Sequence, residues 1–134
     1  MKILIIHGPN TNLLGIWSSK NNSKVTLNKV NQHIRKYIRN KNISIKIIQT
    51  NKEDKIVSYV QKNRKKIDKI ILMPGIWQKS AYVFSDLLLL LSIPFITIAY
   101  KKNEKVGLLN GLTNIYNNNI YLSFEQAIER FINE

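Results

Sequence analysis

Cysteine is absent from the 134 residues of this chain, which excludes disulfides, thiolate chemistry and cysteine-based metal sites. Proline and glycine are scarce, so the few places where they occur mark turns. No apolar run has the length that spans a bilayer, since the longest block, Leu87 to Leu91, is soon followed by Ser92 and Pro94. The first residues also lack the long apolar core and cleavage site of a signal peptide. These absences predict a soluble, cytoplasmic protein without membrane contact.

Acidic residues are few as well: 8 acidic against 21 basic residues give a formal net charge of +13. Such a charge invites a polyanion partner. However, the excess is spread along the chain and comes with many Ile and Asn residues, which share AT-rich codons with Lys, so a compositional bias accounts for it. No nucleic-acid-binding motif or basic recognition helix accompanies the charge. The sequence therefore disfavours nucleic acid as a partner, and a basic polyanion-binding shell stays as one alternative.

Apolar residues make up 44% of the chain, enough for the core of a single domain over residues 1–134. Their spacing predicts helices that alternate with strands: one helix begins after the N-cap Thr26, one begins at about Glu53, one spans Ser80 to Leu91, and the last is capped by Ser123. The strands are expected at residues 3–6, 43–48, 67–72, 94–99 and 120–122. This alternation predicts an α/β, flavodoxin-like three-layer sandwich with a five-stranded parallel sheet.

Several segments have a more particular prediction. Ile43 to Ile48 alternates apolar and polar residues, as a half-exposed edge strand does. Residues 16–24 are polar and without periodicity, which predicts a loop placed to act as a lid. The strongly apolar helix at residues 80–91 indicates burial on more than one side. Residues 100–119 have no clear pattern, and a loop-rich excursion of this length often carries function.

The first strand, Ile3 to Ile6, breaks abruptly into a polar loop that runs from His7 to Gly15. Open α/β sheets place their ligand sites at the carboxyl ends of parallel strands. The functional site is therefore expected at this loop. Asn12 in the loop is either a turn-stabilising residue or a ligand-binding one.

A set of loop, cap and turn residues recurs at fixed spacings along the chain: Gly8, Pro9, Asn10, Asn12, Leu13, Leu14, Gly15, Thr26, Leu27, Gln49, Asn51, Glu53, Pro74, Gly75, Asp86, Ser92, Ile93 and Pro94. In residue type and spacing this set resembles the type II 3-dehydroquinate dehydratases, over roughly residues 1 to 132. The resemblance implies the strand order 2-1-3-4-5 and trimers gathered into a dodecamer. Asp86 and the edge strand would be available for subunit contacts.

The resemblance also implies a reaction, the loss of water from 3-dehydroquinate in the shikimate pathway of aromatic amino acid biosynthesis, without metal or cofactor. A tyrosine made acidic by a nearby arginine removes a proton next to the ketone, and a histidine protonates the leaving hydroxyl. Such chemistry needs a lowered phenol pKa and a positioned acid.

Carried over position by position, most of these groups are replaced in this chain. The tyrosine base falls at Asn22 and the histidine acid at Ala99. The remaining positions are Trp17 for the lid arginine, Met73 for an asparagine, Lys79 for a substrate-binding histidine, Lys101 for a serine and Asn110 for the carboxylate-clamping arginine. Only Asn12 and Asp86 are retained. The resemblance therefore predicts a scaffold that has lost the proton-transfer pair.

Other residues leave alternatives open. Lys79 and Lys101 either attract a carboxylate or are solvated charges. Trp17 either stacks on a ligand or packs within the protein. Tyr100 is the one phenol next to Ala99, the position at which the resemblance implies the histidine acid. His7 is a structural histidine or a proton carrier. Three hypotheses follow: an inactive family member with a structural or binding role, an altered dehydratase with substitute residues, and the polyanion binder.

Overall fold

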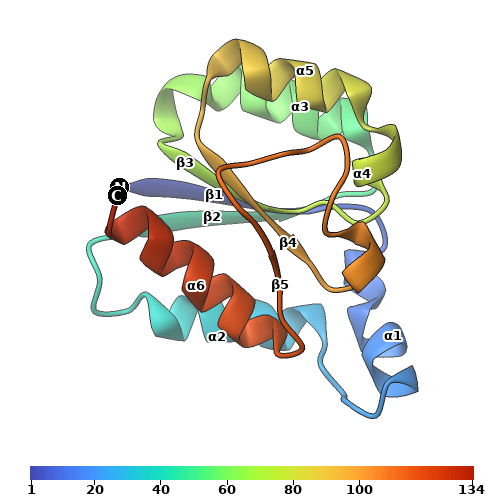
Figure 1. Ribbon diagram of the computed structural model, residues 1–134. Helices are drawn as coiled ribbons and strands as arrows, with labels where there is room; N and C mark the ends of the chain where they lie inside the picture. The colour runs from blue at the N-terminus through green and yellow to red at the C-terminus, as the bar shows by residue number, and fades with distance from the viewer.

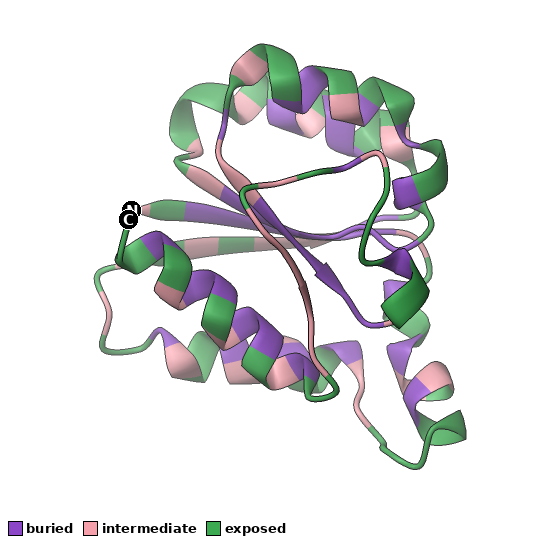
Figure 2. Cartoon of the chain, in the orientation of Figure 1, coloured by how far each residue is buried: buried purple, intermediate pink, exposed green.

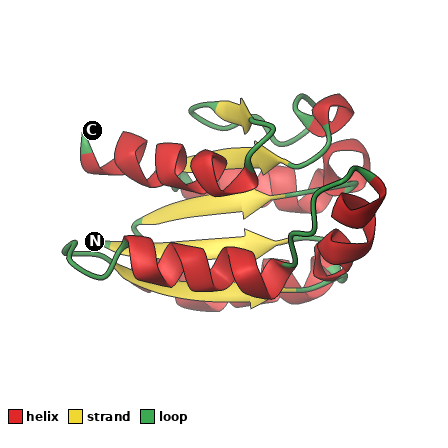
Figure 3. Cartoon of the chain, turned by 90° about the horizontal axis from the view of Figure 1, so that it is seen from below, coloured by secondary structure: helices red, strands yellow, loops and turns green.

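Five parallel strands form the central sheet of the computed structural model, which describes residues 1–134. The sheet order is β2-β1-β3-β4-β5, and all four pairings are parallel, so the predicted α/β fold and strand order are confirmed. Figure 3 shows the strands running in one direction, so their carboxyl ends share an edge of the sheet. The strands are β1 (Lys2–His7), β2 (Ser44–Gln49), β3 (Lys69–Met73), β4 (Phe95–Ala99) and β5 (Asn114–Tyr116).

Helices cover both faces of this sheet (Figure 1). On one face lie α2 (Leu27–Tyr37) and α6 (Ile120–Ile132), and on the other lie α3 (Glu53–Asn63), which the short η2 (Arg64–Lys66) follows, and α5 (Tyr82–Leu91). Ile3 and Ile5 pack toward α2 and α6, whereas Leu4 and Ile6 pack toward α3 and α5, because successive side chains of a strand point to opposite faces. Figure 2 shows the buried residues lining both sides of the sheet. The sheet therefore separates two apolar cores.

The predicted start of α2 and the predicted edge strand are both confirmed. Thr26 is the N-cap of α2, and its side chain accepts a hydrogen bond from the backbone N–H of Lys29 at 3.2 Å. Strand β2 lies at one edge of the sheet, where its residues are half-buried or exposed. A sharp turn follows β3 at Gly75, one of the few glycines, which has a φ of +56° that glycine adopts without strain.

The prediction of an irregular loop over residues 16–24 is wrong in part. After η1 (Thr11–Leu13) the chain forms the helix α1 (Leu14–Lys20), and only the residues beyond it are irregular. Serine side chains bond back to the backbone of this helix, since Ser19 Oγ donates to the carbonyl of Gly15 at 2.8 Å. Ser18 Oγ donates to the carbonyl of Val25 at 2.8 Å, which folds the end of the segment back onto the helix. Bonds of this kind leave no apolar periodicity in the sequence.

The predicted fifth strand at residues 120–122 is also wrong. These residues form the first turn of α6, and β5 lies earlier, at Asn114–Tyr116. The helix begins there because Asn119, not Ser123, is its N-cap: the Asn119 side chain accepts from the backbone N–H of Tyr121 at 3.0 Å. Ile120 is buried in the α2–α6 layer, so the apolar residues read as a strand are the start of the helix's buried face.

The apolar stretch near residues 80–91 differs from the prediction in two ways. It is divided at Ala81 into α4 (Trp77–Ser80) and α5. Within the chain only one side of α5 is buried, with Phe84, Leu87 and Leu88 in the core, while Leu89 and Leu90 are 75% and 73% exposed. The helices are all too short or too polar to span a bilayer.

Candidate functional site

Backbone hydrogen bonds hold the loop after β1 against the ends of two neighbouring strands. The N–H of Gly8 donates to the carbonyl of Met73 at 2.8 Å, and the N–H of Asn10 donates to Asn51 Oδ1 at 3.0 Å. Asn10 itself has a left-handed φ of 65°, a conformation that Asn tolerates better than most residues. Asn12 in η1 is exposed, and its Oδ1 accepts from Gln49 Nε2 at 3.5 Å. The loop thus presents the Asn12 amide at the carboxyl edge of the sheet.

The predicted lid positions lie on or just after α1. Trp17 is half-buried on this helix, and its ring meets the Tyr100 ring edge-on with 5.3 Å between centroids. Asn22 is exposed in the turn beyond the helix, with a left-handed φ of 62°. The Asn22 side chain makes no hydrogen bond within the chain, so the structure brings Trp17, and not Asn22, to the residues at the end of β4.

The end of β4 carries three predicted positions in a row. Ala99 is 4% exposed and contributes a methyl group, while Tyr100 is 8% exposed. Lys101 is half-buried, and its Nζ lies 5.4 Å from the centre of the Tyr100 ring. Burial and the charge of Glu104 raise the pKa of Tyr100, because both disfavour the phenolate. Tyr100 is therefore a neutral phenol at neutral pH.

Glu104 is a buried carboxyl that the sequence prediction missed. It ends η3 (Lys102–Glu104), is 7% exposed, and its enclosed oxygen Oε1 has no hydrogen-bond partner. Burial raises its pKa, and the nearby charges of Lys101 and Lys79 oppose that shift. Both predicted lysine positions therefore influence this carboxyl through their charge, and neither forms an ion pair with it. The one signal in the sequence is that Glu104 is the sole acidic residue between Tyr100 and Asn119.

The remaining predicted positions do not join this group. Met73, at the end of β3, is fully buried in the core, and Asp86 is exposed on α5. Asn110 is exposed, and its Oδ1 accepts from Asn114 Nδ2 at 2.6 Å, at the start of β5. Neither Asp86 nor Asn110 contacts Asn12 or Ala99 through a hydrogen bond or ion pair. Within one chain, then, the predicted site is divided, because Ala99 and Lys101 lie at the carboxyl end of β4, whereas Asn110 lies beside Pro94 and Phe95 at the amino end of that strand.

His7, considered above as a proton carrier, is fully buried at the end of β1. Its Nε2 donates to Asn31 Oδ1 at 2.9 Å, and its ring packs edge-on against Phe124. Burial lowers its pKa to about 4, and the bond to Asn31 opposes this shift only in part. A neutral, enclosed imidazole of this kind has a structural role.

Nowhere do three or more His, Asp or Glu side chains gather as metal ligands would.

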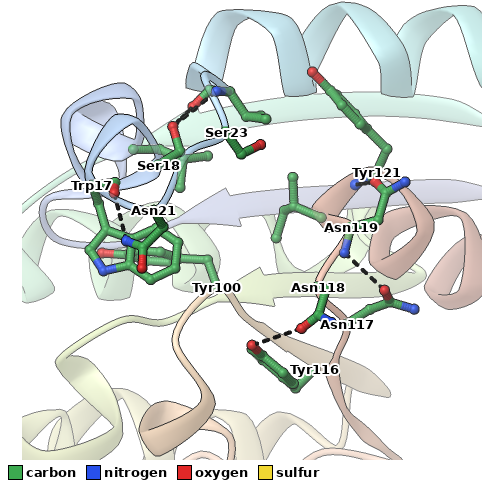
Figure 4. Close-up of a pocket in the computed structure, with 13 residues that line it drawn as sticks. Trp17, Ser18, Asn21, Ser23, Tyr100, Tyr116, Asn117, Asn118, Asn119 and Tyr121 are labelled. Carbon is green, nitrogen blue, oxygen red and sulfur yellow. Dashed lines mark hydrogen bonds between the residues drawn. The ribbon is translucent and has the colours of Figure 1, made fainter.

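A cavity of about 510 Å³ opens between α1, the end of β4 and the turn that leads from β5 into α6 (Figure 4). Trp17 and Tyr100 form one wall, and residues 116–121 form the opposite wall. The aromatic lining residues are Trp17, Tyr100, Tyr116 and Tyr121, and the apolar ones are Leu14, Val25 and Ile120. Of the predicted site residues, only Trp17 and Tyr100 line this cavity.

The polar lining of the cavity consists of uncharged groups: the amides of Asn21, Asn117, Asn118 and Asn119 and the hydroxyls of Ser18 and Ser23. Asn21 Nδ2 donates to the Trp17 carbonyl at 2.9 Å, which holds that side chain against α1. The Tyr116 hydroxyl donates to Asn118 Oδ1 at 3.2 Å, and Figure 4 shows this pair facing the Trp17–Tyr100 wall. The turn at residues 116–121 gave no recognisable signal in the sequence, since a run of three asparagines is compatible with any loop.

Comparison with known proteins identifies related sequences. The sequence model of the dehydroquinase class II family matches residues 1–104. A 3-dehydroquinate dehydratase of Clostridium botulinum (strain 657 / Type Ba4) is 30% identical over 106 residues, which are 76% of this chain and 72% of the relative. One from Haemophilus influenzae (strain PittEE) is 28% identical over 97 residues, which are 72% of this chain. That match spans 65% of the Haemophilus relative, less than two thirds of its length.

A solved structure resembles the whole chain. The type II dehydroquinase of Butyrivibrio crossotus DSM 2876 superposes with a TM-score of 0.87 at 25% identity, covering 100% of this chain and 98% of that one. The similarity extends through β5 and α6, which lie beyond the residues that the family model matches.

Proposed function

Because the chain belongs to the dehydroquinase class II family, we propose that it is a single-domain, cytoplasmic member of that family that has lost dehydratase activity and keeps a binding or structural role. The observation that carries the proposal is the chemistry of Asn22 and Ala99. These residues fall where the family resemblance implies the tyrosine base and the histidine acid. An amide does not titrate and a methyl group carries no proton, so neither residue can transfer one.

The neighbouring groups support the proposal, because they do not supply the missing functions. Tyr100 is the nearest phenol to Ala99 in the sequence, but its pKa is raised, whereas a phenol that acts as base needs a lowered one. Trp17, at the implied arginine position, brings no positive charge that could acidify a phenol. Asn110 and Lys101 likewise replace an arginine and a serine that hold the substrate.

The alternative function, an altered dehydratase, is favoured by one observation. Glu104 is a buried carboxyl with a raised pKa, and Lys79 and Lys101 lie close enough for their charges to act on it. A carboxyl with a raised pKa can move protons near neutral pH, and an ammonium group can bind a carboxylate. This alternative requires that Glu104 and a lysine together replace the family's tyrosine and histidine.

A direct assay separates the two functions. Purified protein is incubated with 3-dehydroquinate, and the enone absorbance of the dehydroshikimate product is followed, with the Clostridium botulinum relative as the active control. We expect no turnover above background, because general acid and general base catalysis are each worth about 10²- to 10⁴-fold in rate. Turnover well above the uncatalysed rate that disappears in Glu104→Gln or Tyr100→Phe would establish the altered enzyme instead.

Restoring the implied residues tests the same proposal from the other side. Asn22→Tyr alone and Ala99→His alone are expected to restore nothing, since each group needs the other and the base needs its arginine. Detectable turnover is expected only from the combined set: Trp17→Arg, Asn22→Tyr, Met73→Asn, Lys79→His, Ala99→His, Lys101→Ser and Asn110→Arg. Activity in either single variant would show that the proton-transfer pair was not what the chain lacked.

The protein is also proposed to form a homo-oligomer, a trimer or a dodecamer built from trimers. The support comes from α5, where Tyr82, Val83, Leu89 and Leu90 are between 62% and 75% exposed. So many large apolar side chains on one helix are typical of a surface that another subunit covers. Asp86 lies on the same helix, and the edge strand β2 offers a second surface for contact.

A further inference from the structure

The cavity between α1 and the β5–α6 turn differs in charge from the rest of the molecule. Charged residues make up 22% of the chain, yet none of the 13 residues that line the cavity is charged. No side chain of the lining offers a cation to a carboxylate or phosphate, and the nearby Lys101 ammonium lies over the Tyr100 ring, 5.4 Å from its centre, so an anion would lose hydration without a direct ion pair to the lining. The cavity is therefore suited to a neutral ligand, whereas 3-dehydroquinate carries a carboxylate. Its volume of about 510 Å³ is in the range of small-molecule sites.

The lining also has more hydrogen-bonding groups than the chain itself uses. The oxygens of Asn117 and Asn119 accept from the backbone N–H groups of Asn119 and Tyr121, at 2.9 and 3.0 Å. Because an N–H can only donate, these bonds fix the oxygens, and the two amide nitrogens make no further bond within the chain. The hydroxyls of Tyr100 and Ser23 also have no hydrogen bond within the chain.

This combination of groups favours one class of neutral ligand. A nucleobase carries its few polar atoms in one plane and would leave most of these amides and hydroxyls unpaired, at a cost in affinity. A cyclic polyol carries hydroxyl groups around its rim, and each hydroxyl can both donate and accept. Its C–H face can pack on the aromatic wall of Trp17 and Tyr100.

We propose that the cavity lined by Trp17, Tyr100, Tyr116 and Asn118 is a binding site for a neutral cyclic polyol, such as a monosaccharide or an inositol. Residues 116–119, which form one wall of the cavity, lie beyond residue 104, where the match to the family's sequence model ends. The proposal concerns binding and not turnover, and it stands or falls independently of the dehydratase assay.

The test measures binding of four probes to the whole protein: myo-inositol, D-glucose, quinate and uridine. Tryptophan fluorescence reports on the cavity through Trp17, because the other tryptophan, Trp77, is 3% exposed and does not line it. Ligand-observed NMR provides a second readout that does not depend on tryptophan. We expect saturable binding of myo-inositol or D-glucose with a millimolar Kd, as is usual for ligands of this size, and no saturable binding of quinate.

Three variants connect the binding to the cavity. Tyr116→Phe removes only a hydroxyl, and Asn118→Leu removes an amide of similar size, so both are expected to weaken polyol binding by about 3- to 10-fold. Asn40→Leu makes the same change at an exposed residue outside the cavity and is expected to leave the Kd unchanged. Circular dichroism confirms that each variant is folded.

Three results would overturn the proposal. The first is binding of quinate as tight as that of the neutral polyols, which would mean an anion site. The second is tighter binding of uridine, which would mean a nucleobase site. The third is the absence of saturable polyol binding by both readouts, or polyol binding that neither Tyr116→Phe nor Asn118→Leu weakens.

Discussion

At the scale of single residues, burial shifts the pKa values of His7 and Glu104 in opposite directions. Burial lowers the pKa of His7 to about 4 and raises that of Glu104. Both shifts have the same origin, since a low-dielectric surrounding disfavours the charged form of either group. The imidazole is enclosed and bonded to Asn31, whereas the carboxyl lies in η3, which follows β4, and the charges of Lys101 and Lys79 oppose the rise in its pKa. Burial thus keeps the imidazole neutral at neutral pH and makes the carboxyl a weaker acid than usual.

The lowered pKa of His7 predicts a loss of stability in acid. Above pH 6.5 the imidazole is neutral in both the folded and the unfolded protein, so it adds no pH dependence. As the pH falls from 6.5 to about 4, the unfolded chain binds a proton that the folded protein does not, which lowers the free energy of unfolding by up to about 3 kcal/mol. Urea unfolding over this pH range should show that loss. His7→Gln should lack it, and equal pH slopes in the two proteins would contradict the assignment.

Ser92 predicts a stabilising substitution. It caps the carboxyl end of α5 with a left-handed φ of 54°, a conformation that strains any side chain with a Cβ. Ser92→Gly should therefore raise the free energy of unfolding by about 1 kcal/mol. Ser58→Gly, at an exposed position inside α3, is the control and should lower it by about 0.5 to 1 kcal/mol. Denaturant unfolding measures both, and a destabilised Ser92→Gly would be inconsistent with the strained backbone.

At the scale of elements, one buried side chain holds the long segment between β4 and β5 against α4. Gln78 is 2% exposed, its Nε2 donates to the carbonyl of Leu109 at 3.0 Å, and its Oε1 accepts from the Leu109 N–H at 2.8 Å. Gly107 lies so close to this residue that an added Cβ would be 2.4 Å from the Gln78 carbonyl oxygen. These contacts order a segment whose sequence shows no periodicity.

Gln78→Leu should therefore destabilise the protein strongly. The substitution leaves a backbone N–H and a backbone carbonyl of Leu109 buried without partners, at a cost of about 2 to 4 kcal/mol. Ser85→Ala is the milder control, because Ser85 donates a single bond, at 3.2 Å, to the Leu108 carbonyl. Urea unfolding monitored by circular dichroism gives both values. Equal losses from the two variants would mean that Gln78 does not hold this segment.

The elements also show what the sequence could and could not predict. Strand β1 and helix α2 were predicted because their order is local: an apolar run ends at a turn, and a threonine cap precedes a regular apolar face. Helix α1 was missed because only two of its residues, Leu14 and Ser18, are buried, so its sequence has no apolar periodicity. The turn at residues 116–121 and the surroundings of Glu104 were missed because they depend on contacts between distant segments, which no local pattern records.

At the scale of the whole molecule, the charge of +13 and the apolar face of α5 have opposite effects on assembly. The apolar face favours association, whereas copies with the same large charge repel one another, and salt screens that repulsion. We expect at least a trimer in sedimentation at micromolar concentration and moderate salt, and stronger association as salt is added.

The double variant Leu89→Ser with Leu90→Ser tests which surface is used. Both side chains are mostly exposed within the chain, so the fold should survive while the oligomer dissociates to monomers. Val106→Ser, at another apolar residue that is 73% exposed, is the control and should leave the assembly intact. Monomers only in the unmodified protein, or an oligomer unaffected by the double variant, would refute the proposed contact.

The free edge of β2 has a consequence for aggregation. Its outer backbone N–H and carbonyl groups have no partner strand within the chain, and such an edge can template the addition of another extended chain. Lys46 is exposed near the middle of this strand. A second copy pairing there in antiparallel orientation with Lys46 opposite Lys46 places their Cβ atoms roughly 5 Å apart, and the repulsion between the two like charges opposes fibril growth. Outside an assembly that covers this edge, acetylation of Lys46 would therefore remove the charge that prevents one sheet from continuing into the next.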